Sequence, residues 1–315
     1  MAHVIRNDGR LALALQGGGS FGAFTWGVLD RLLEEGTEFD AISGASAGAV
    51  NAVLLASGLQ RGGREGARDA LRGFWEDVGH APGLPPFVLS ALNASAQFIT
   101  PYNYPLNMNP MRGLLAKHVD FDRLREEPPM RLLIAATRVR DGAPIIFRED
   151  EVSLDAVLAS ACLPLLQRAV EINGEAYWDG AFSANPPLRR LAIDTGAEDI
   201  LLVQIMPEEE DKVPHSHAEI THRAQMIAFN ASLQHELQAL EDLRASTDGT
   251  KALLSPSSRK LRHLRLHRIA AADSVADLNG RSMMDTSPGL LRELHDAGRE
   301  AASGWLFRHE TKQAA

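Results

Sequence analysis

The sequence predicts an α/β fold, a single-domain three-layer α/β/α sandwich with a mostly parallel central sheet. Short apolar segments that fit buried strands alternate with longer segments of helical periodicity along the chain. A unit of strand, glycine turn and helix also occurs twice in succession near the N-terminus, and helical crossovers of this kind connect parallel strands. With 315 residues, of which 45% are hydrophobic, the chain is long enough for a sizeable core.

The first two units place a glycine-rich turn after a buried strand. The apolar run Leu11–Leu15 is expected to be a strand, Gly17–Gly19 a turn, and residues 21–35 a helix with one apolar side. Residues 39–42 form the second expected strand. After a second turn at Ser46, the alanine-rich and leucine-rich residues 47–56 have the composition of a helix.

Further strand and helix patterns follow after an interrupted segment. These patterns lie at residues 131–137, 145–147, 152–161, 200–205, 264–269 and 288–307, with a hairpin at 169–177 that turns at Asn173–Gly174. A long helix is expected at about 218–243. Its expected apolar positions are Ile220, Ile227, Leu233, Leu237 and Leu240. We expect this helix to pack on the sheet of its own chain.

The domain organisation expected from these patterns is one domain over residues 1–315. Its catalytic core spans about 11–207 and includes a lid-like segment inserted at about 58–130, where glycines and prolines interrupt the regular pattern. A helical and strand portion at about 208–315 completes it. We read the inserted segment as helices and loops that cover a site.

Composition excludes several classes of function. The formal net charge of −9 disfavours nucleic acid as a partner, because binding to phosphates needs clustered Lys and Arg. A single cysteine, Cys162, excludes an internal disulfide and favours a reducing compartment, so we expect the cytoplasm. No apolar run approaches about 18 residues, and no transmembrane helix is expected.

Ser46 is the candidate nucleophile. It lies in Gly44-Ala45-Ser46-Ala47-Gly48, between an expected strand and an expected helix. A nucleophile on such a sharp turn needs close backbone approach on both sides, which glycine permits. The alternative is a serine that only caps a helix. Because the Gly17–Gly19 turn is able to lie beside Ser46, we favour a serine nucleophile next to an oxyanion hole.

The glycine turn also satisfies a second motif. Gly17-x-Gly19-x-x-Gly22 follows a strand and opens a helix, as the dinucleotide-binding fingerprint requires. That fingerprint also needs an acid near the end of the second strand, whereas Asp40 lies near its start. An NAD-binding oxidoreductase of the Rossmann type is therefore the less favoured alternative to a serine hydrolase.

A serine nucleophile needs a base, and Asp179 is the strongest candidate. Of the eleven histidines, none lies in a setting that singles it out. Asp179 stands in Trp178-Asp179-Gly180-Ala181, directly after the expected hairpin, and leads into Asn185-Pro186-Pro187. The similar triplet Asp141-Gly142-Ala143 lies between two expected strands, and we predict a hairpin turn there.

The glycine turn, the Ser46 motif and the Asp179 motif with Asn185 and Pro187 together resemble the patatin-like phospholipases, from about Leu11 to Leu188. The resemblance implies a serine acyl-ester hydrolase acting on a lipid or another acyl ester, with a Ser46–Asp179 dyad and no metal or organic cofactor. It also implies an oxyanion hole from the backbone amides of Gly17, Gly18 and Gly19. The remaining motif residues are Gly22, Gly44, Gly48, Gly180, Ala181 and Asn185. Peripheral membrane contact is compatible with such a substrate.

Two consequences of this resemblance concern the base and the substrate. An aspartate with an ordinary pKa of about 3.9 is a weak base, so Asp179 has to be partly desolvated. Phe21 stands where the family's turn usually carries Arg or Lys, and Ala181 replaces a glycine. The segment Tyr102–His118, with Asn107-Met108-Asn109-Pro110, resembles a bacterial branch associated with hydroxyalkanoate metabolism. A hydroxyalkanoate ester is therefore an alternative substrate, and an acyl-binding protein with a dead site is a third possibility.

Overall fold

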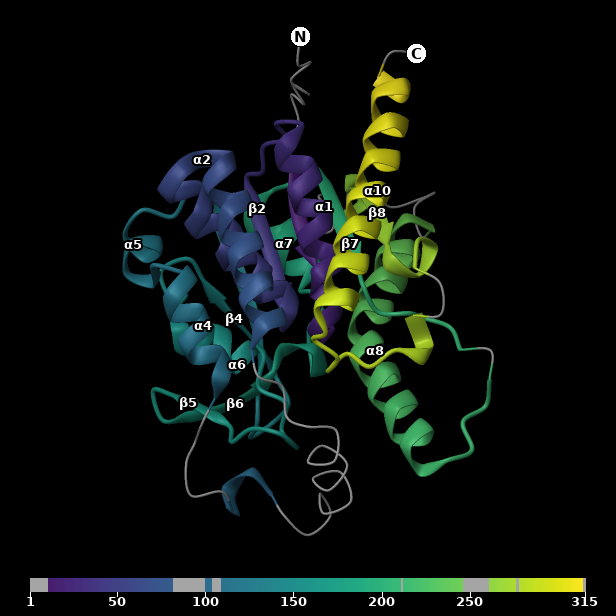
Figure 1. Cartoon of the computed structure of the whole chain (residues 1–315). Coiled ribbons are helices and arrows are strands. Elements are labelled where there is room, and N and C mark those ends of the chain that lie inside the picture. The colour runs from purple at the N-terminus through teal and green to yellow at the C-terminus, as the bar shows by residue number, and fades with distance from the viewer. Residues whose placement is uncertain are drawn as a thin grey trace.

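The computed structural model describes residues 11–81, 100–103, 109–210, 212–245, 261–275 and 278–313. These residues form an eight-stranded sheet in the order β5-β6-β3-β2-β1-β7-β8, with β4 paired to β3 beside this path (Figure 1). The strands are β1 (Leu11–Leu15), β2 (Ala41–Ala45), β3 (Arg131–Arg138), β4 (Pro144–Arg148), β5 (Val170–Ile172), β6 (Glu175–Asp179), β7 (Asp199–Gln204) and β8 (Arg265–Ala270). Strands β3, β2, β1, β7 and β8 are parallel, and β4, β5 and β6 pair antiparallel.

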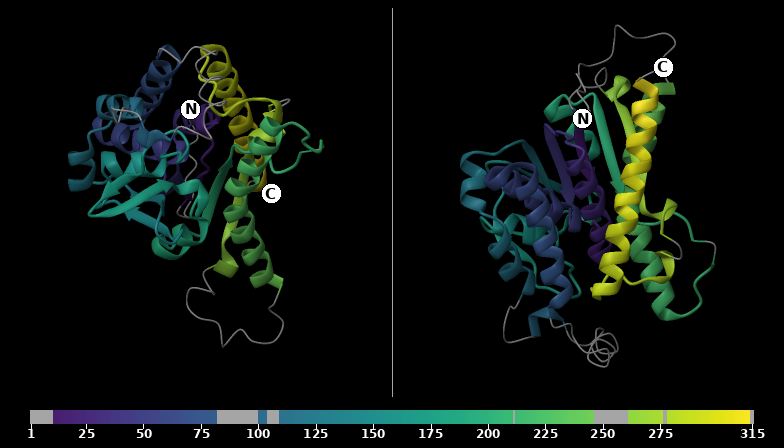
Figure 2. Two further views of the ribbon diagram at one scale, coloured as in Figure 1. Left: turned by 90° about the horizontal axis from the view of Figure 1, so that it is seen from below. Right: turned by 45° about the horizontal axis from the view of Figure 1, so that its top comes forward.

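Helices cover both faces of this sheet. They are α1 (Gly22–Glu34), α2 (Ala47–His80), α4 (Pro110–His118), α5 (Phe121–Glu126), α6 (Leu154–Ser160), α7 (Leu188–Thr195), α8 (His217–Ala245) and α10 (Pro288–Gln313). Short 3-10 turns include η1 (Gly19–Phe21), η2 (Pro101–Asn103) and η3 (Gly180–Phe182). Helices α1, α2 and α10 pack on one face and α7 and α8 on the other, as Figures 1 and 2 show. The predicted α/β/α architecture is confirmed.

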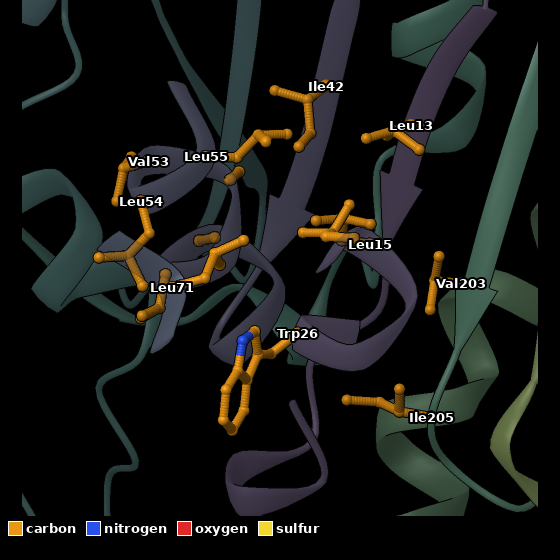
Figure 3. Close-up of a cluster of buried hydrophobic side chains, with 14 of the residues drawn as sticks. Leu13, Leu15, Trp26, Ile42, Val53, Leu54, Leu55, Leu71, Val203 and Ile205 are labelled. Carbon is orange, nitrogen blue, oxygen red and sulfur yellow. The ribbon is translucent and has the colours of Figure 1, made fainter. Parts of the chain in front are cut away.

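Strand β1 separates the two layers through its alternating sequence. Leu11, Leu13 and Leu15 belong to the core under α1, α2 and α10, whereas Ala12 and Ala14 face α7 and α8. Figure 3 shows Leu13 and Leu15 between side chains of the neighbouring strands β2 and β7. Successive side chains of a strand point to opposite faces, and burial of one leucine contributes roughly 1.5–3 kcal/mol. This five-residue strand therefore holds both helical layers.

Two elements differ from the sequence prediction. Helix α2 continues far beyond residue 56, and its backbone leaves helical geometry only at Gly62 and Gly63. Its second stretch persists because it buries a face that includes Leu71 and Phe74. In α8, Ile220 and Ile227 are 51% and 54% exposed, so the predicted apolar face is wrong there. Leu233 and Leu240 are buried as predicted, and Met226 and Phe229 join them on the face that meets the rest of the protein.

The predicted hairpin and the predicted lid-like segment can be compared with the structure in part. The predicted hairpin is confirmed as β5 and β6, and its turn residues Asn173 and Gly174 have positive φ values of 54° and 80°. The described part of the lid-like segment at about 58–130 consists of the rest of α2, η2, α4 and α5. Residues 82–99 and 104–108 of that segment, which include Asn107 and Met108, lie outside the described residues.

Candidate active site

Ser46 lies on the sharp turn between β2 and α2. Its backbone has φ 52° and ψ −123°, a left-handed conformation that is uncommon for a residue other than glycine. Its amide donates to Ser160 at the end of α6, to the carbonyl oxygen at 3.1 Å and to Oγ at 3.0 Å. The residue is 8% exposed. The turn is thus held by two hydrogen bonds, and Ser46 is largely buried.

The glycine turn lies directly against Ser46. A Cβ atom on Gly17 would lie 2.7 Å from Cβ of Ser46 and 2.6 Å from the carbonyl oxygen of Ala45, so only glycine fits there. The other predicted motif glycines also lie in close contacts. Gly22 lies against Ala47, Gly44 against Gly48, Gly48 against Leu15, and Gly180 against Ala135. The structure therefore brings the two glycine-containing turns together.

Asp179 ends β6 and points its carboxylate at Ser46. The Ser46 hydroxyl donates to Oδ2 of Asp179 at 2.7 Å, and the amide of Ala181 donates to Oδ1 at 2.8 Å. The Asp179 backbone is also held, because its amide donates to the Cys162 carbonyl at 2.8 Å and its carbonyl accepts from Thr137 Oγ1 at 2.7 Å. The replacement of glycine by Ala181 keeps the amide donor.

Burial changes the acidity of Asp179. The carboxylate is fully buried, and the desolvation of its charged form raises the pKa of Asp179 to about 7. The hydrogen bonds from Ala181 and Ser46 act in the opposite direction and lower it. The desolvation expected for this carboxylate is confirmed. Its pKa lies close to neutral pH, which suits a general base.

Asp141 differs from Asp179 in its location, in its charged partner and in the direction of its pKa shift. It lies in the turn between β3 and β4, where it pairs with Arg138 at 2.7 Å and accepts from the amide of Ala143 at 3.1 Å. The hydrogen bond from Arg138 is the main reason that the pKa of Asp141 is lowered to about 2. The predicted hairpin turn is confirmed.

Asn185 ties the glycine turn to the opposite layer. Its Oδ1 accepts from the Gly17 amide at 2.7 Å, and its Nδ2 donates to the Phe229 carbonyl in α8 at 3.1 Å. The Gly17 amide is therefore already used. Within the described residues, no acceptor bonds to the amides of Gly18 and Gly19. Of the three predicted oxyanion donors, the Gly17 amide is thus bonded to a side chain, and the oxyanion role of all three stays a prediction.

Several residues of the site escaped the sequence analysis. Gln16 is fully buried, and its Oε1 accepts from the amides of Ile205 and Met206 at 2.9 Å each, while its Nε2 donates to Oδ1 of Asn230 at 2.9 Å. Ser160, which holds the Ser46 amide, was also missed. A polar side chain at the end of a buried apolar segment is the signal that both residues share.

The structure also bears on three further expectations, which concern Phe21, the histidines and membrane-spanning helices. Phe21, at the family's usual cation position, is fully buried in the core, so this position offers no charge to a substrate. Among the described residues, no histidine hydrogen-bonds to Ser46 or Asp179. In the same part of the chain, no helix is both long enough and apolar enough to cross a membrane.

A serine on a strained strand-to-helix turn, bonded to a buried carboxylate, has the arrangement of an activated nucleophile. Comparison with known protein families identifies the family of the chain. The model of the family described as patatin-like phospholipase matches residues 13–192, more than half of the chain. The chain therefore belongs to the patatin-like phospholipase family, and the glycine turn, Ser46 and Asp179 all lie within the matched residues.

The individual relatives have low sequence identity to the chain. The chain is 27% identical to YjjU of Escherichia coli over 213 residues, which cover 64% of this chain and 53% of YjjU. It is 25% identical to an NTE family protein of Mycobacterium tuberculosis over 299 residues, covering 90% of this chain and 48% of that protein. The chain thus spans about half the length of these curated relatives. VipD from Legionella pneumophila aligns in structure with a TM-score of 0.47 at 17% identity, covering 96% of this chain and 67% of that chain.

Proposed function

We propose that this protein is a serine hydrolase that cleaves carboxylic esters of lipids. The hydrogen bond of 2.7 Å from the Ser46 hydroxyl to the buried Asp179 carboxylate carries the proposal. Membership of the patatin-like phospholipase family supports the same chemistry. Ser46 is the nucleophile and Asp179 the general base, without an intervening histidine.

The proposed reaction has two halves. Ser46 Oγ attacks the ester carbonyl carbon while its proton passes to Oδ2 of Asp179. The tetrahedral intermediate collapses when Asp179 gives this proton to the leaving alcohol oxygen, which yields an acyl-serine ester and a free alcohol. Water then loses a proton to Asp179 and attacks the acyl carbon. The acid leaves as the proton returns to Ser46 Oγ.

The oxyanion of both intermediates is assigned to the amides of Gly18 and Gly19. These two amides have no acceptor among the described residues, and the turn that carries them lies against Ser46. Loss of one such donor in serine hydrolases costs roughly 2.7–4 kcal/mol of transition-state stabilisation. Gly17 has a positioning role in this proposal, since its amide is held by Asn185.

The proposed substrate is an acyl ester of a lipid, reached by peripheral contact with a lipid surface. Leu165 and Leu166 are 73% and 49% exposed and follow Cys162, whose carbonyl holds the Asp179 amide. Phe182, three residues after Asp179, is 38% exposed. Exposed apolar side chains this close to Asp179 support contact with acyl chains.

Covalent labelling tests the proposal most directly. Purified protein is incubated with a fluorophosphonate, and mass spectrometry identifies the modified residue. We expect Ser46 to be labelled, and Ser46→Ala to be neither labelled nor active on a chromogenic acyl ester. Labelling of a residue other than Ser46 contradicts the proposal. The absence of any labelling, together with full activity of Ser46→Ala, contradicts it as well. Saturable NAD(H) binding without labelling would favour the dinucleotide-binding alternative.

Substitution of the two aspartates tests the base. Asp179→Asn removes the proton acceptor and is expected to lower kcat by about a thousandfold or more, given that general bases contribute roughly 10²–10⁴-fold. Asp141→Asn is the matched control, because Asp141 also precedes a glycine and an alanine but is bonded to Arg138. It is expected to keep activity near that of the wild type. Ligand binding without labelling or turnover in the wild type would favour an acyl-binding protein.

A further inference from the structure

The turn Arg281–Asp285 contacts the glycine turn from outside the residues that the family model matches. The Ser20 amide donates to the Met283 carbonyl at 2.8 Å. Gly19 has a positive φ of 57°, and a Cβ there would collide with the same carbonyl. Met283 itself is 8% exposed. The Arg281–Asp285 turn therefore forms part of the wall behind the proposed oxyanion site.

This contact fixes one end of the glycine turn, and Asn185 fixes the other. The Gly17 amide is bonded to Asn185 and the Ser20 amide to Met283. Between these two anchored peptide groups lie Gly18 and Gly19, whose amides are assigned to the oxyanion. Because the turn is short, a displacement of either anchor changes the direction of both free amides.

The Arg281–Asp285 turn is held in place by hydrogen bonds within it and by an ion pair with α10. The Ser282 carbonyl accepts from the Asp285 amide at 3.1 Å, and Ser282 Oγ accepts from the Met284 amide at 3.2 Å. Arg281 forms two parallel hydrogen bonds to the Glu293 carboxylate in α10, at 2.7 and 2.8 Å. This bidentate pair joins the turn to the helix that follows it.

Helix α10 is in turn fixed to the helix that leaves the glycine turn. Backbone atoms of α1 and α10 approach closely at two glycines, where Gly27 lies against the His295 carbonyl and Gly298 against the Phe24 carbonyl. Arg299 also bonds to Asp30. Helices α1 and α10 thus form one unit, and the Arg281–Glu293 pair connects the turn to it.

We propose that Arg281 and Glu293 are a positioning pair for the oxyanion site, acting through the Met283 carbonyl on Ser20. The inference rests on the proposed function. The side chains of the pair are 28% and 52% exposed, and such a pair contributes little to global stability. Its removal is therefore expected to impair catalysis far more than folding, because oxyanion donors depend strongly on their orientation.

A charge swap in the full-length chain tests this role. The variants are Arg281→Glu, Glu293→Arg and the double variant, in which an ion pair is restored with the two charges exchanged. Steady-state kinetics with a soluble chromogenic acyl ester, the rate of Ser46 labelling by a fluorophosphonate, and the denaturant midpoint are measured for each. We expect each single variant to lower kcat and the labelling rate by about tenfold with KM within about twofold, and the double variant to recover most of the loss.

A second ion pair serves as the control. Arg131 and Glu149 join two elements at the start of β3, the strand end away from Ser46, with side-chain exposures of 48% and 19%. Arg131→Glu and Glu149→Arg are expected to leave kcat unchanged. Where a charge reversal at the Arg281–Glu293 pair gives no folded protein, Arg281→Lys and Glu293→Gln replace it, with a smaller fall in kcat.

The outcomes separate this inference from the proposed function. A wild-type protein that is neither labelled at Ser46 nor active on any acyl ester contradicts the proposed function itself. An active wild type whose folded pair variants keep wild-type kcat overturns only the positioning role. Equal loss in the double variant and in the single variants, together with a lowered denaturant midpoint, also overturns it, since a purely structural pair would behave in that way.

Discussion

At the scale of single residues, Asp179 combines two properties that oppose each other. Burial makes its carboxylate a much stronger base than an exposed aspartate, whose pKa is about 3.9. The same burial keeps the group protonated until the pH approaches its raised pKa of about 7. The raised pKa makes the ionised Asp179 carboxylate a stronger base, but the carboxylate is ionised mainly above that pKa. The pKa therefore sets the lower limit of the pH range in which a Ser–Asp pair can work.

The pH profile of kcat/KM is the first prediction. In the proposed mechanism Asp179 acts as a base only when ionised, so kcat/KM is expected to rise with pH and to reach half its maximum near pH 7, the pKa of the buried carboxyl. The measurement uses a soluble acyl ester from pH 4 to pH 9, with the residual rate of Asp179→Asn subtracted. A half-maximum near pH 4 would show that the carboxyl is not desolvated during the reaction.

Ser160 gives a second prediction at this scale. In Ser160→Ala the Ser46 amide keeps the carbonyl acceptor but loses Oγ, so the strained turn is held less firmly. We expect kcat to fall by about tenfold and the free energy of unfolding by about 1 kcal/mol.

Ser153→Ala is the matched control for that change. Ser153 caps the other end of α6 by accepting from the Ala156 amide at 3.2 Å, and its loss costs about 1 kcal/mol of stability. Because it does not contact Ser46, its kcat is expected to stay at the wild-type level. Equal kcat values for the two variants would mean that Ser160 supports only the helix.

At the scale of elements, local patterns predicted the units of strand, turn and helix. The glycine turn after β1 and the Ser46 turn after β2 were expected from apolar runs followed by glycines, and both are present. What holds these turns was not predictable, because the partners come from far along the chain. Asn185 lies 168 residues from Gly17 and Ser160 lies 114 residues from Ser46.

The same limit explains the error in α8. A helical period shows that one side of a helix is apolar, but which residues meet the sheet depends on how the helix is placed in three dimensions. Ile220 and Ile227 fit the period and are exposed, whereas Asn230 is polar and 6% exposed, because it meets Gln16 and the Pro207 carbonyl. A polar residue that bonds to Gln16 and to Pro207 therefore lies on the buried side of α8.

The turn after α6 leads to a prediction about lipid contact. Leu165→Asp places a charge at an exposed apolar position, three residues after the Cys162 that bonds to Asp179. If this position contacts a lipid surface, the charge has to enter the interface with the lipid. We expect activity on phosphatidylcholine vesicles to fall by about tenfold, since burial of one leucine is worth roughly 1.5–3 kcal/mol, and activity on a soluble ester to stay unchanged.

Phe307→Asp is the control for this prediction. Phe307 is 70% exposed and lies in the C-terminal part of α10. The C-terminal end of this helix lies away from β5 and β6 in Figure 1. Its substitution is expected to leave both activities unchanged. If Leu165→Asp lowered the two activities equally, the turn after α6 would support the site without contacting lipid.

At the scale of the whole molecule, the residues beyond the family match complete the fold. The match ends at residue 192, whereas β7 begins at Asp199 and pairs with β1 in the middle of the sheet. Helix α1, predicted to have one apolar side, is buried on nearly all sides because α10 packs over it. The residues beyond the family match thus supply a central strand and the cover of α1.

Cooperative unfolding is the prediction at this scale. If the chain is one domain, as its sequence predicts, denaturant is expected to unfold all layers in a single transition. Trp178 in β6 and Trp305 in α10 report on separate parts of the molecule. Single-tryptophan variants, followed by fluorescence and by far-UV circular dichroism, should have coincident midpoints. Two separated midpoints would divide the chain into independent units.

The alternation of leucine and alanine in β1 also specifies how this strand pairs. Its leucines belong to one hydrophobic cluster, and Ala12 and Ala14 belong to the other. A slip of β1 by one residue against its neighbours would exchange the two sets and place leucines where alanines pack. The alternation therefore favours the observed register, in which Leu15 pairs with Gly44 and Gly17 then lies beside Ser46.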